Sequence, residues 1–160
     1  MNQLERLILQ IGKENVEKIK NTVVAIIGLG GVGGYALESI TRSGIGTIII
    51  IDNDIIDITN LNRQLISTHQ NIGQSKVDAW EERIKMINPD CKVIKIKEFI
   101  TKDNFPIIFQ NKINYFKDCI QVVNISGRYV PDLYHIILHV LIIIAIVSIV
   151  LVSDKPKNNE

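Results

Sequence analysis

A glycine-rich run follows directly on an apolar segment near the start of the chain. Residues 23–34 read VVAIIGLGGVGG and include Gly28, Gly30, Gly31 and Gly33. Glycines have no Cβ, so backbone N–H groups can approach a phosphate chain closely, and the amino end of a following helix adds roughly half a positive charge. Residues 28–34, called the glycine loop below, are therefore predicted to bind phosphate.

Polar and charged residues further along suit the rest of a nucleotide. Asp52 follows the next apolar segment, where a carboxylate can accept hydrogen bonds from ribose hydroxyls. Asn60, Arg63 and Lys76 lie in or just after the polar stretch 53–74. Cations there can stabilise oxygens that gain charge when a triphosphate is attacked at its α-phosphorus. A dinucleotide oxidoreductase needs no such cations, so ATP is favoured and NAD(P) is the alternative ligand.

The hydrophobic periodicity predicts an α/β framework that positions these residues. Two short helical pieces are expected within residues 4–19, interrupted by Gly12, and a buried strand over 23–27. A helix follows the glycine loop and stops near Gly44, before a second buried strand over 47–51. A strand, a helix and a second strand in this order predict a Rossmann-like parallel sheet.

A second helix and a third strand are expected beyond the polar stretch. Ser75 has the properties of an N-cap, with Asp78 at the capping-box position, and Asn88-Pro89 ends the helix. The segment 92–97 alternates isoleucines with lysines. Four lysines here could contact a nucleic-acid backbone, although a solvated sheet edge is the favoured interpretation: Lys92, Lys95, Lys97 and Lys102. A further helix is predicted to start at Thr101.

Composition is compatible with one globular domain and no extended basic surface. The chain has 160 residues, 46% of them apolar, and a formal net charge of +1. Cys91 and Cys119 are far apart and form no C-x-x-C pair, so neither a disulfide framework nor a cysteine zinc site is predicted. Met1 is followed by Asn, Gln and Leu-Glu rather than by a basic and then apolar run, which favours a cytoplasmic domain without a signal peptide.

Several motifs occur in a fixed order along the first two thirds of the chain. They read GLGGVG at 28–33, IDND at 51–54, TNLNRQ at 59–64, GQSKV at 73–77 and INP at 87–89. Together they resemble the ThiF/MoeB superfamily, relatives of ubiquitin-activating enzymes that adenylate a carboxylate with ATP and magnesium. Within it, the chain is most similar to the tRNA threonylcarbamoyladenosine dehydratases. The resemblance covers about residues 4–113.

The resemblance implies a role for each of the residues singled out above. The glycine loop would hold the ATP phosphates and Asp52 the ribose. Asn60, Arg63 and Lys76 would bind the triphosphate and the leaving pyrophosphate, and Arg6 would reach across a homodimer to the ATP of the partner. Arg63, Lys76 and Arg6 are thereby implied as catalytic, and ATP and Mg²⁺ as cofactors.

The reaction implied by the resemblance is an adenylation followed by ring closure. The carboxylate of a threonylcarbamoyl group on a tRNA adenosine would form an acyl-adenylate, and a nitrogen of the same group would attack it. No nucleophilic cysteine is needed, because the attacking group is intramolecular and the acyl-adenylate is a good electrophile. The implied partners are ATP, a tRNA carrying threonylcarbamoyladenosine and a second copy of the chain.

The family pattern is lost after residue 113. An Asp-Ala-x-Asp type motif, whose aspartate holds magnesium in the superfamily, is expected there, but Asp118 does not lie in such a motif. No metal-ligating residue is therefore predicted: His135 and His139 lie one helical turn apart but have no third ligand nearby. An inactive or membrane-anchored nucleotide-binding remnant is accordingly an alternative to an active enzyme.

The end of the chain is strongly apolar. After a linker over 114–132, residues 133–152 are long enough as a helix to span roughly 30 Å of hydrocarbon, and a polar tail covers 153–160. A single membrane-spanning helix anchoring a cytoplasmic domain is one prediction. A frameshifted or truncated tail and a buried helix of the same domain are the other two interpretations.

Overall fold

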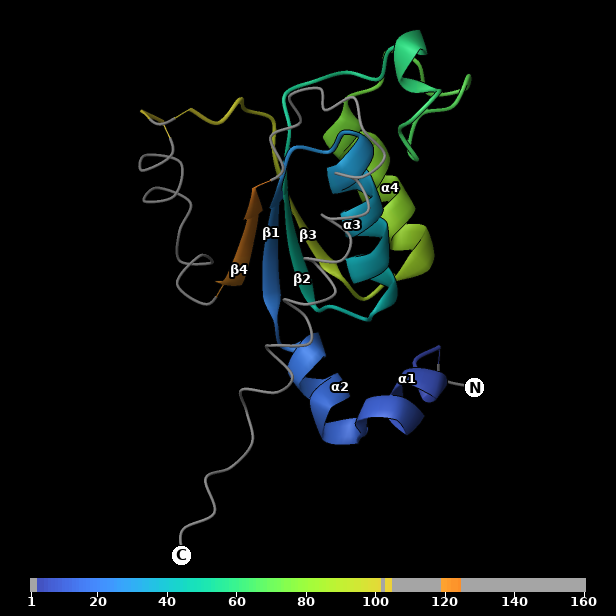
Figure 1. Cartoon of the computed structure of the whole chain (residues 1–160), viewed down its shortest axis with the longest axis vertical. Helices are drawn as coiled ribbons and strands as arrows, with labels where there is room; N and C mark the ends of the chain where they lie inside the picture. The colour runs from blue at the N-terminus through green and yellow to red at the C-terminus, as the bar shows by residue number, and fades with distance from the viewer. Residues whose placement is uncertain (1–2, 102, 105–118, 125–160) are drawn as a thin grey trace, which may run out of the picture. The chain divides into compact units, whose positions relative to one another are not determined.

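The computed structural model describes residues 3–101, 103–104 and 119–124, and these form one parallel sheet with helices packed on it (Figure 1). The sheet has the order β3-β2-β1-β4. Its strands are β1 (Val23–Ile27), β2 (Thr47–Ile51), β3 (Lys92–Ile96) and β4 (Cys119–Asn124). β1 pairs in parallel with β2 and β4, and β2 pairs in parallel with β3. The predicted α/β class with a parallel, Rossmann-like sheet is confirmed.

The helices begin and end where the glycines and polar residues predict. They are α1 (Glu5–Ile11), α2 (Lys13–Lys20), α3 (Gly31–Arg42), the 3₁₀ turn η1 (Ile58–Asn60) and α4 (Lys76–Ile87). Gly12 separates α1 from α2 at φ 85°, and Gly44 follows α3 at φ 84°. Both angles lie in the left-handed region, which glycine adopts without the steric cost that a Cβ brings. The interruption at Gly12 and the stop near Gly44 are confirmed.

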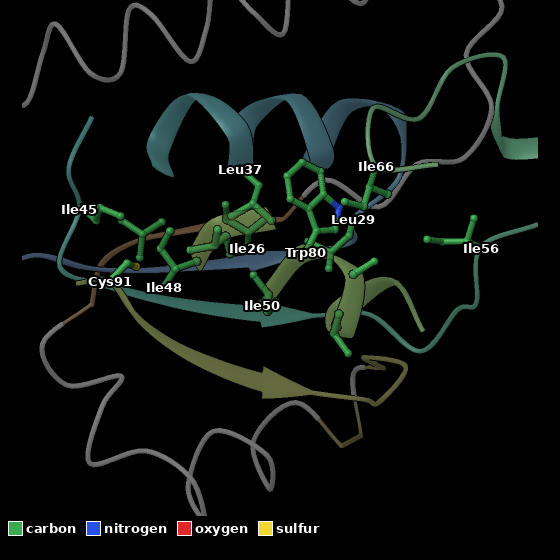
Figure 2. Packing of buried hydrophobic residues seen from close by; sticks show 14 residues of the cluster. Ile26, Leu29, Leu37, Ile45, Ile48, Ile50, Ile56, Ile66, Trp80 and Cys91 are labelled. Atoms are coloured by element: carbon green, nitrogen blue, oxygen red, sulfur yellow. The ribbon is translucent and has the colours of Figure 1, made fainter. Parts of the chain in front are cut away.

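The main core lies between the sheet and the helices α3 and α4 (Figure 2). Leu37 of α3 and Trp80 of α4 are fully buried against Ile26, Ile48 and Ile50 of the two central strands. A second buried cluster consists of the alternate residues of these two strands, Ala25, Ile27, Ile49 and Ile51, together with Ile96 of β3. Burial of both faces explains why the strands are nearly continuous runs of β-branched residues.

A buried carboxylate joins α3 to α4. The Glu38 side chain is 12% exposed and accepts hydrogen bonds from Arg83 of α4 at 2.6 and 2.9 Å, as well as from Arg42 one turn along α3. Burial by itself raises the pKa of Glu38, but the hydrogen bonds and charges of Arg83 and Arg42 outweigh it, so that the pKa lies below its ordinary value. The ionised carboxylate therefore stabilises the packing of the two helices.

We expect Glu38→Gln to lower the free energy of unfolding by about 1–2 kcal/mol at pH 7. Because the folded pKa is depressed, the contribution of the native carboxylate is present above pH 4.5, the ordinary pKa, and is lost as the pH falls through the folded pKa. Urea unfolding at pH 7 and below pH 4 measures both effects. Glu14→Gln, which removes a highly exposed i,i+4 pair with Lys18, is the control and should change little. An equal loss for Glu38→Gln at both pH values would contradict this account.

Two details differ from the sequence-based expectations. The Ser75–Asp78 capping box is wrong: Ser75 is the N-cap of α4 but makes no side-chain cap hydrogen bond. The Asp78 carboxylate instead accepts hydrogen bonds from Lys95 and Lys97 beyond the helix. In addition, β4 lies inside the segment 114–132, which was expected to be a linker of uncertain structure.

The C-terminal expectations concern residues that the structure does not describe. The apolar segment 133–152, the polar tail 153–160 and nearly all of the helix expected from Thr101 onward lie outside the described residues. Among residues 3–101, 103–104 and 119–124, no helix has both the length and the apolar character needed to cross a bilayer. The membrane-spanning segment therefore stays a prediction.

Candidate functional site

The glycine loop connects the carboxyl end of β1 to the amino end of α3. Gly28 has φ 85°, and a Cβ at Gly33 would overlap the carbonyl oxygen of Gly28, so the first turn of α3 lies directly on the loop. α3 begins at Gly31 after the N-cap Gly30, with no side-chain cap hydrogen bond and no acidic residue in its first turn. Its first N–H groups have no intrahelical acceptors, as at every helix start, and can donate to an anion.

Asp52 fixes the glycine loop to the end of β2. One oxygen of its carboxylate accepts a hydrogen bond from the backbone N–H of Leu29 at 2.6 Å, and the other accepts one from the N–H of Asp54 at 2.8 Å. Asp52 is half-buried. Each carboxylate oxygen keeps a further lone pair, so the side chain can still accept hydrogen bonds from ribose hydroxyls beside the loop.

The turn after η1 packs against the glycine loop. A Cβ at Gly31 would lie 3.5 Å from the carbonyl oxygen of Arg63, and one at Gly30 would lie 3.9 Å from Nε2 of Gln64. Asn60 is 8% exposed and its side-chain oxygen accepts a hydrogen bond from the N–H of Asp57, which completes a capping box around η1. Asn60 thus has an architectural role in addition to the ligand role implied for it.

Arg63 presents an exposed guanidinium beside the glycine loop. Its Nη1 donates hydrogen bonds to the carbonyl oxygen of Thr59 at 2.8 Å and to the side-chain oxygen of Asn62 at 3.0 Å. A guanidinium has five N–H donors, so several remain for phosphate oxygens. The side chain is held by its own turn and is available to an anion.

Lys76 is buried at the first turn of α4. Its ammonium group donates a hydrogen bond to the carboxylate of Asp54 at 2.7 Å, and its side chain is 5% exposed whereas that of Asp54 is 60% exposed. The two residues are brought together by an antiparallel bridge between Ile55 and Ser75. Lys76 is therefore not a surface lysine, and its cation is held by Asp54, whose N–H donates a hydrogen bond to Asp52.

Arg6 is the one implied catalytic residue that does not join this site in its own chain. A Cβ at Gly44 would lie 2.5 Å from the side chain of Leu4, so the start of α1 packs beside the amino end of β2. The glycine loop lies at the opposite, carboxyl end of the sheet, as Figure 1 shows. Arg6 is exposed on α1. Arg6 could therefore reach a nucleotide only in a second copy of the chain, as the predicted homodimer implies.

Lys95 of β3 and Lys97, just beyond its end, are paired with acidic residues of α4. Lys95 pairs with Asp78 at 2.8 Å and with Glu81 at 2.6 Å, and Lys97 also pairs with Asp78. The hydrogen bonds from Lys95 and Lys97 lower the pKa of Asp78. These pairings make Lys95 and Lys97 components of a charged edge, as the solvated-edge interpretation expects, and the described residues give no independent sign of a tRNA contact there.

Cys91 lies in the core, apart from the glycine loop. Cys91 is a free, fully buried thiol, and burial raises its pKa to about 11, which keeps it protonated and unreactive at neutral pH. Within the described part of the chain, no three His, Cys, Asp or Glu side chains gather closely enough to hold a metal ion.

A family model corresponds to most of the chain. The model of the ThiF family matches residues 4–132. The chain belongs to the ThiF family. The match extends beyond residue 113, where the motif resemblance ended, and includes β4.

The similar proteins include dehydratases that act on a tRNA nucleoside. The ThiF-family chain is 45% identical over 118 residues to a tRNA threonylcarbamoyladenosine dehydratase of Bacillus subtilis, covering 74% of this chain and 46% of that protein. The Escherichia coli protein of the same name is 36% identical over 112 residues, covering 70% and 42%. Its crystal structure in complex with ATP matches with a TM-score of 0.65 at 32% identity over 69% of this chain and 45% of that chain. The chain spans about half the length of these relatives.

Two site residues went unnoticed in the sequence. Asp54 stands in the IDND motif, but only the antiparallel approach of 55–56 to 73–75 shows that it faces Lys76. Gln64 is 7% exposed against the glycine loop, and its side-chain oxygen has no hydrogen-bond partner. Its position directly after Arg63 was the only available signal.

Proposed function

We propose that this ThiF-family chain binds ATP and adenylates a carboxylate, acting as a tRNA threonylcarbamoyladenosine dehydratase. The observation that carries the proposal is the convergence of the uncapped amino end of α3, the Asp52 carboxylate and the Lys76 ammonium at the carboxyl ends of β1 and β2. In open parallel sheets, ligands bind at this edge. The similarity to dehydratases from two bacteria, one of them solved with ATP, supports the choice of nucleotide and substrate.

In the proposed reaction each group has a distinct electrostatic task. The N–H groups of the glycine loop bind phosphate oxygens, and Asp52 accepts hydrogen bonds from the ribose. Arg63 and Lys76 stabilise negative charge on the triphosphate as the substrate carboxylate attacks the α-phosphorus and pyrophosphate leaves. A nitrogen of the threonylcarbamoyl group then attacks the acyl-adenylate and loses its proton, and AMP leaves with one oxygen of the former carboxylate. The threonylcarbamoyl group has thereby lost the elements of water.

The remaining components are parts of the same proposal. Mg²⁺ would enter with the ATP phosphates and neutralise part of their charge. A homodimer would place Arg6 of one copy at the nucleotide of the other. The domain would be cytoplasmic, and residues 133–152 would anchor it to a membrane if they form a spanning helix. Size measurements in solution test the homodimer, and membrane fractionation of the full chain tests the membrane anchor.

We expect ATP with Mg²⁺ to raise the melting temperature of the chain, whereas NAD leaves it unchanged. Ligand at 100 times its dissociation constant stabilises a folded protein by about 2.7 kcal/mol, which amounts to several degrees for a domain of this size. Thermal unfolding with each ligand measures the difference. Supplying tRNA that carries threonylcarbamoyladenosine should then produce AMP. A shift with NAD alone would favour an oxidoreductase, and ATP binding without AMP formation would favour the inactive remnant.

A further inference from the structure

Lys76 is an unusual cation because it is almost completely buried. Its ammonium has three N–H donors, and Asp54 is its one hydrogen-bond acceptor among the described residues. Buried polar groups are normally fully hydrogen-bonded, and an isolated buried charge is costly. Two N–H groups of a buried cation are thus left for an acceptor that the described residues do not supply.

Asp54 is itself held rigidly in place. Its N–H donates to the Asp52 carboxylate at 2.8 Å, and its carbonyl oxygen accepts the N–H of Lys76 at 3.1 Å. The neighbouring Ile56 exchanges two backbone hydrogen bonds of 2.8 Å with Gly73 and Gln74. The carboxylate of Asp54 therefore fixes the Lys76 ammonium relative to Asp52, which also holds the glycine loop.

We propose that Asp54 is a positioning residue, which holds the Lys76 ammonium so that the site distinguishes a nucleoside triphosphate from a nucleoside monophosphate. The inference rests on the proposed function, because it assumes that nucleotide phosphates bind at the glycine loop and that Lys76 contacts the phosphates beyond the α-phosphate. The cation is provided by Lys76, and Asp54 acts through it.

The Asp54 carboxylate would also repel the nucleotide phosphates. This repulsion is weaker than its positioning effect on Lys76. Its side chain is 60% exposed, so water and salt screen its charge towards a ligand. The hydrogen bond that it makes to the ammonium is short and ends on a side chain that is 5% exposed, where screening is small. Without Asp54, the long Lys76 side chain is free to move, and ligand binding must order it again at a cost in entropy. Loss of the Asp54 charge should therefore weaken triphosphate binding.

The test compares ATP with AMP by isothermal titration calorimetry on the full chain. For Asp54→Asn we expect ATP affinity to fall about tenfold and AMP affinity to change less than about twofold. In a Lys76→Met background, Asp54→Asn should have no further effect on ATP, because Asp54 acts through Lys76. Asp90→Asn, the same charge change in the turn after α4, is the matched control and should bind like the wild type.

Each other outcome has a definite meaning. If Asp54→Asn does not fold, Asp54→Glu serves instead, since it keeps the charge but moves the carboxylate, and it should lose ATP affinity several-fold with AMP affinity unchanged. Equal losses for ATP and AMP, an unchanged ATP affinity, or a full effect in the Lys76→Met background would each overturn the inference. A wild-type chain that binds no ATP would overturn the proposed function and the inference together, whereas the other results leave the proposed function standing.

Discussion

Replacing Gly33 by alanine is expected to destabilise the chain by about 3 kcal/mol and to abolish ATP binding. A methyl group at this position would overlap the carbonyl oxygen of Gly28, and that oxygen belongs to backbone, which cannot rotate away as a side chain can. Gly28 is itself held by a 2.9 Å hydrogen bond from its N–H to Ile51. The first turn of α3 must therefore move away from the loop whose N–H groups are proposed to bind phosphate.

Two other glycines separate the effect on stability from the effect on binding. A Cβ at Gly46 would overlap the carbonyl oxygen of Lys20, far from the glycine loop, so Gly46→Ala should destabilise without altering the ATP affinity of the folded protein. Gly12→Ala meets no atom within 4 Å and should cost only the strain of its φ of 85°. Urea unfolding and ATP titration of the three variants measure this. Gly33→Ala protein with wild-type ATP affinity would exclude the loop as the phosphate site.

Lys76→Met is expected to lower ATP affinity about tenfold to a hundredfold while reducing stability by less than about 1 kcal/mol. Methionine fills the space of the buried lysine stem without a charge. Loss of the ammonium leaves Asp54 without this partner, but its side chain is 60% exposed and can be hydrated, so no buried charge remains unpaired. Most of the measured effect should then fall on binding and AMP formation.

Two further variants test whether the effect depends on where the positive charge lies. Arg63→Ala, which removes the exposed guanidinium, should also reduce AMP formation more than stability. Lys13→Met removes an equal charge from the exposed start of α2 and should change neither. Calorimetric titration with ATP and chemical unfolding provide the two quantities. Unchanged turnover in both Arg63→Ala and Lys76→Met would refute the assignment of the site.

Most of the fold could be predicted because its signals are local. β1 and β2 begin and end at the residues that the apolar runs predict, and the left-handed Gly12 and Gly44 mark the helix ends. The approach of Asp52 to the glycine loop could also be predicted, since residues at the carboxyl ends of neighbouring parallel strands meet at one edge of the sheet. Periodicity and glycine placement were sufficient for these features.

The features that could not be predicted depend on contacts between distant segments. The Asp78 carboxylate pairs with Lys95 of β3 and with Lys97 just after that strand, and no pattern within α4 contains that information. The burial of Lys76 follows from its meeting with Asp54 across a loop of more than twenty residues. Local patterns predict which elements form, whereas these pairings follow from how the elements pack.

The position of β1 in the sheet has a consequence for synthesis on the ribosome. β1 ends at Ile27, and its two neighbours are β2, complete at Ile51, and β4, which begins only at Cys119. At translation rates of about 5–20 residues per second, some 5 to 20 s separate the emergence of β1 from that of β4. During this interval one edge of an apolar strand has no partner, and such edges promote aggregation. We therefore expect the exposed edge of β1 to be a site of aggregation in the nascent chain until β4 has been made.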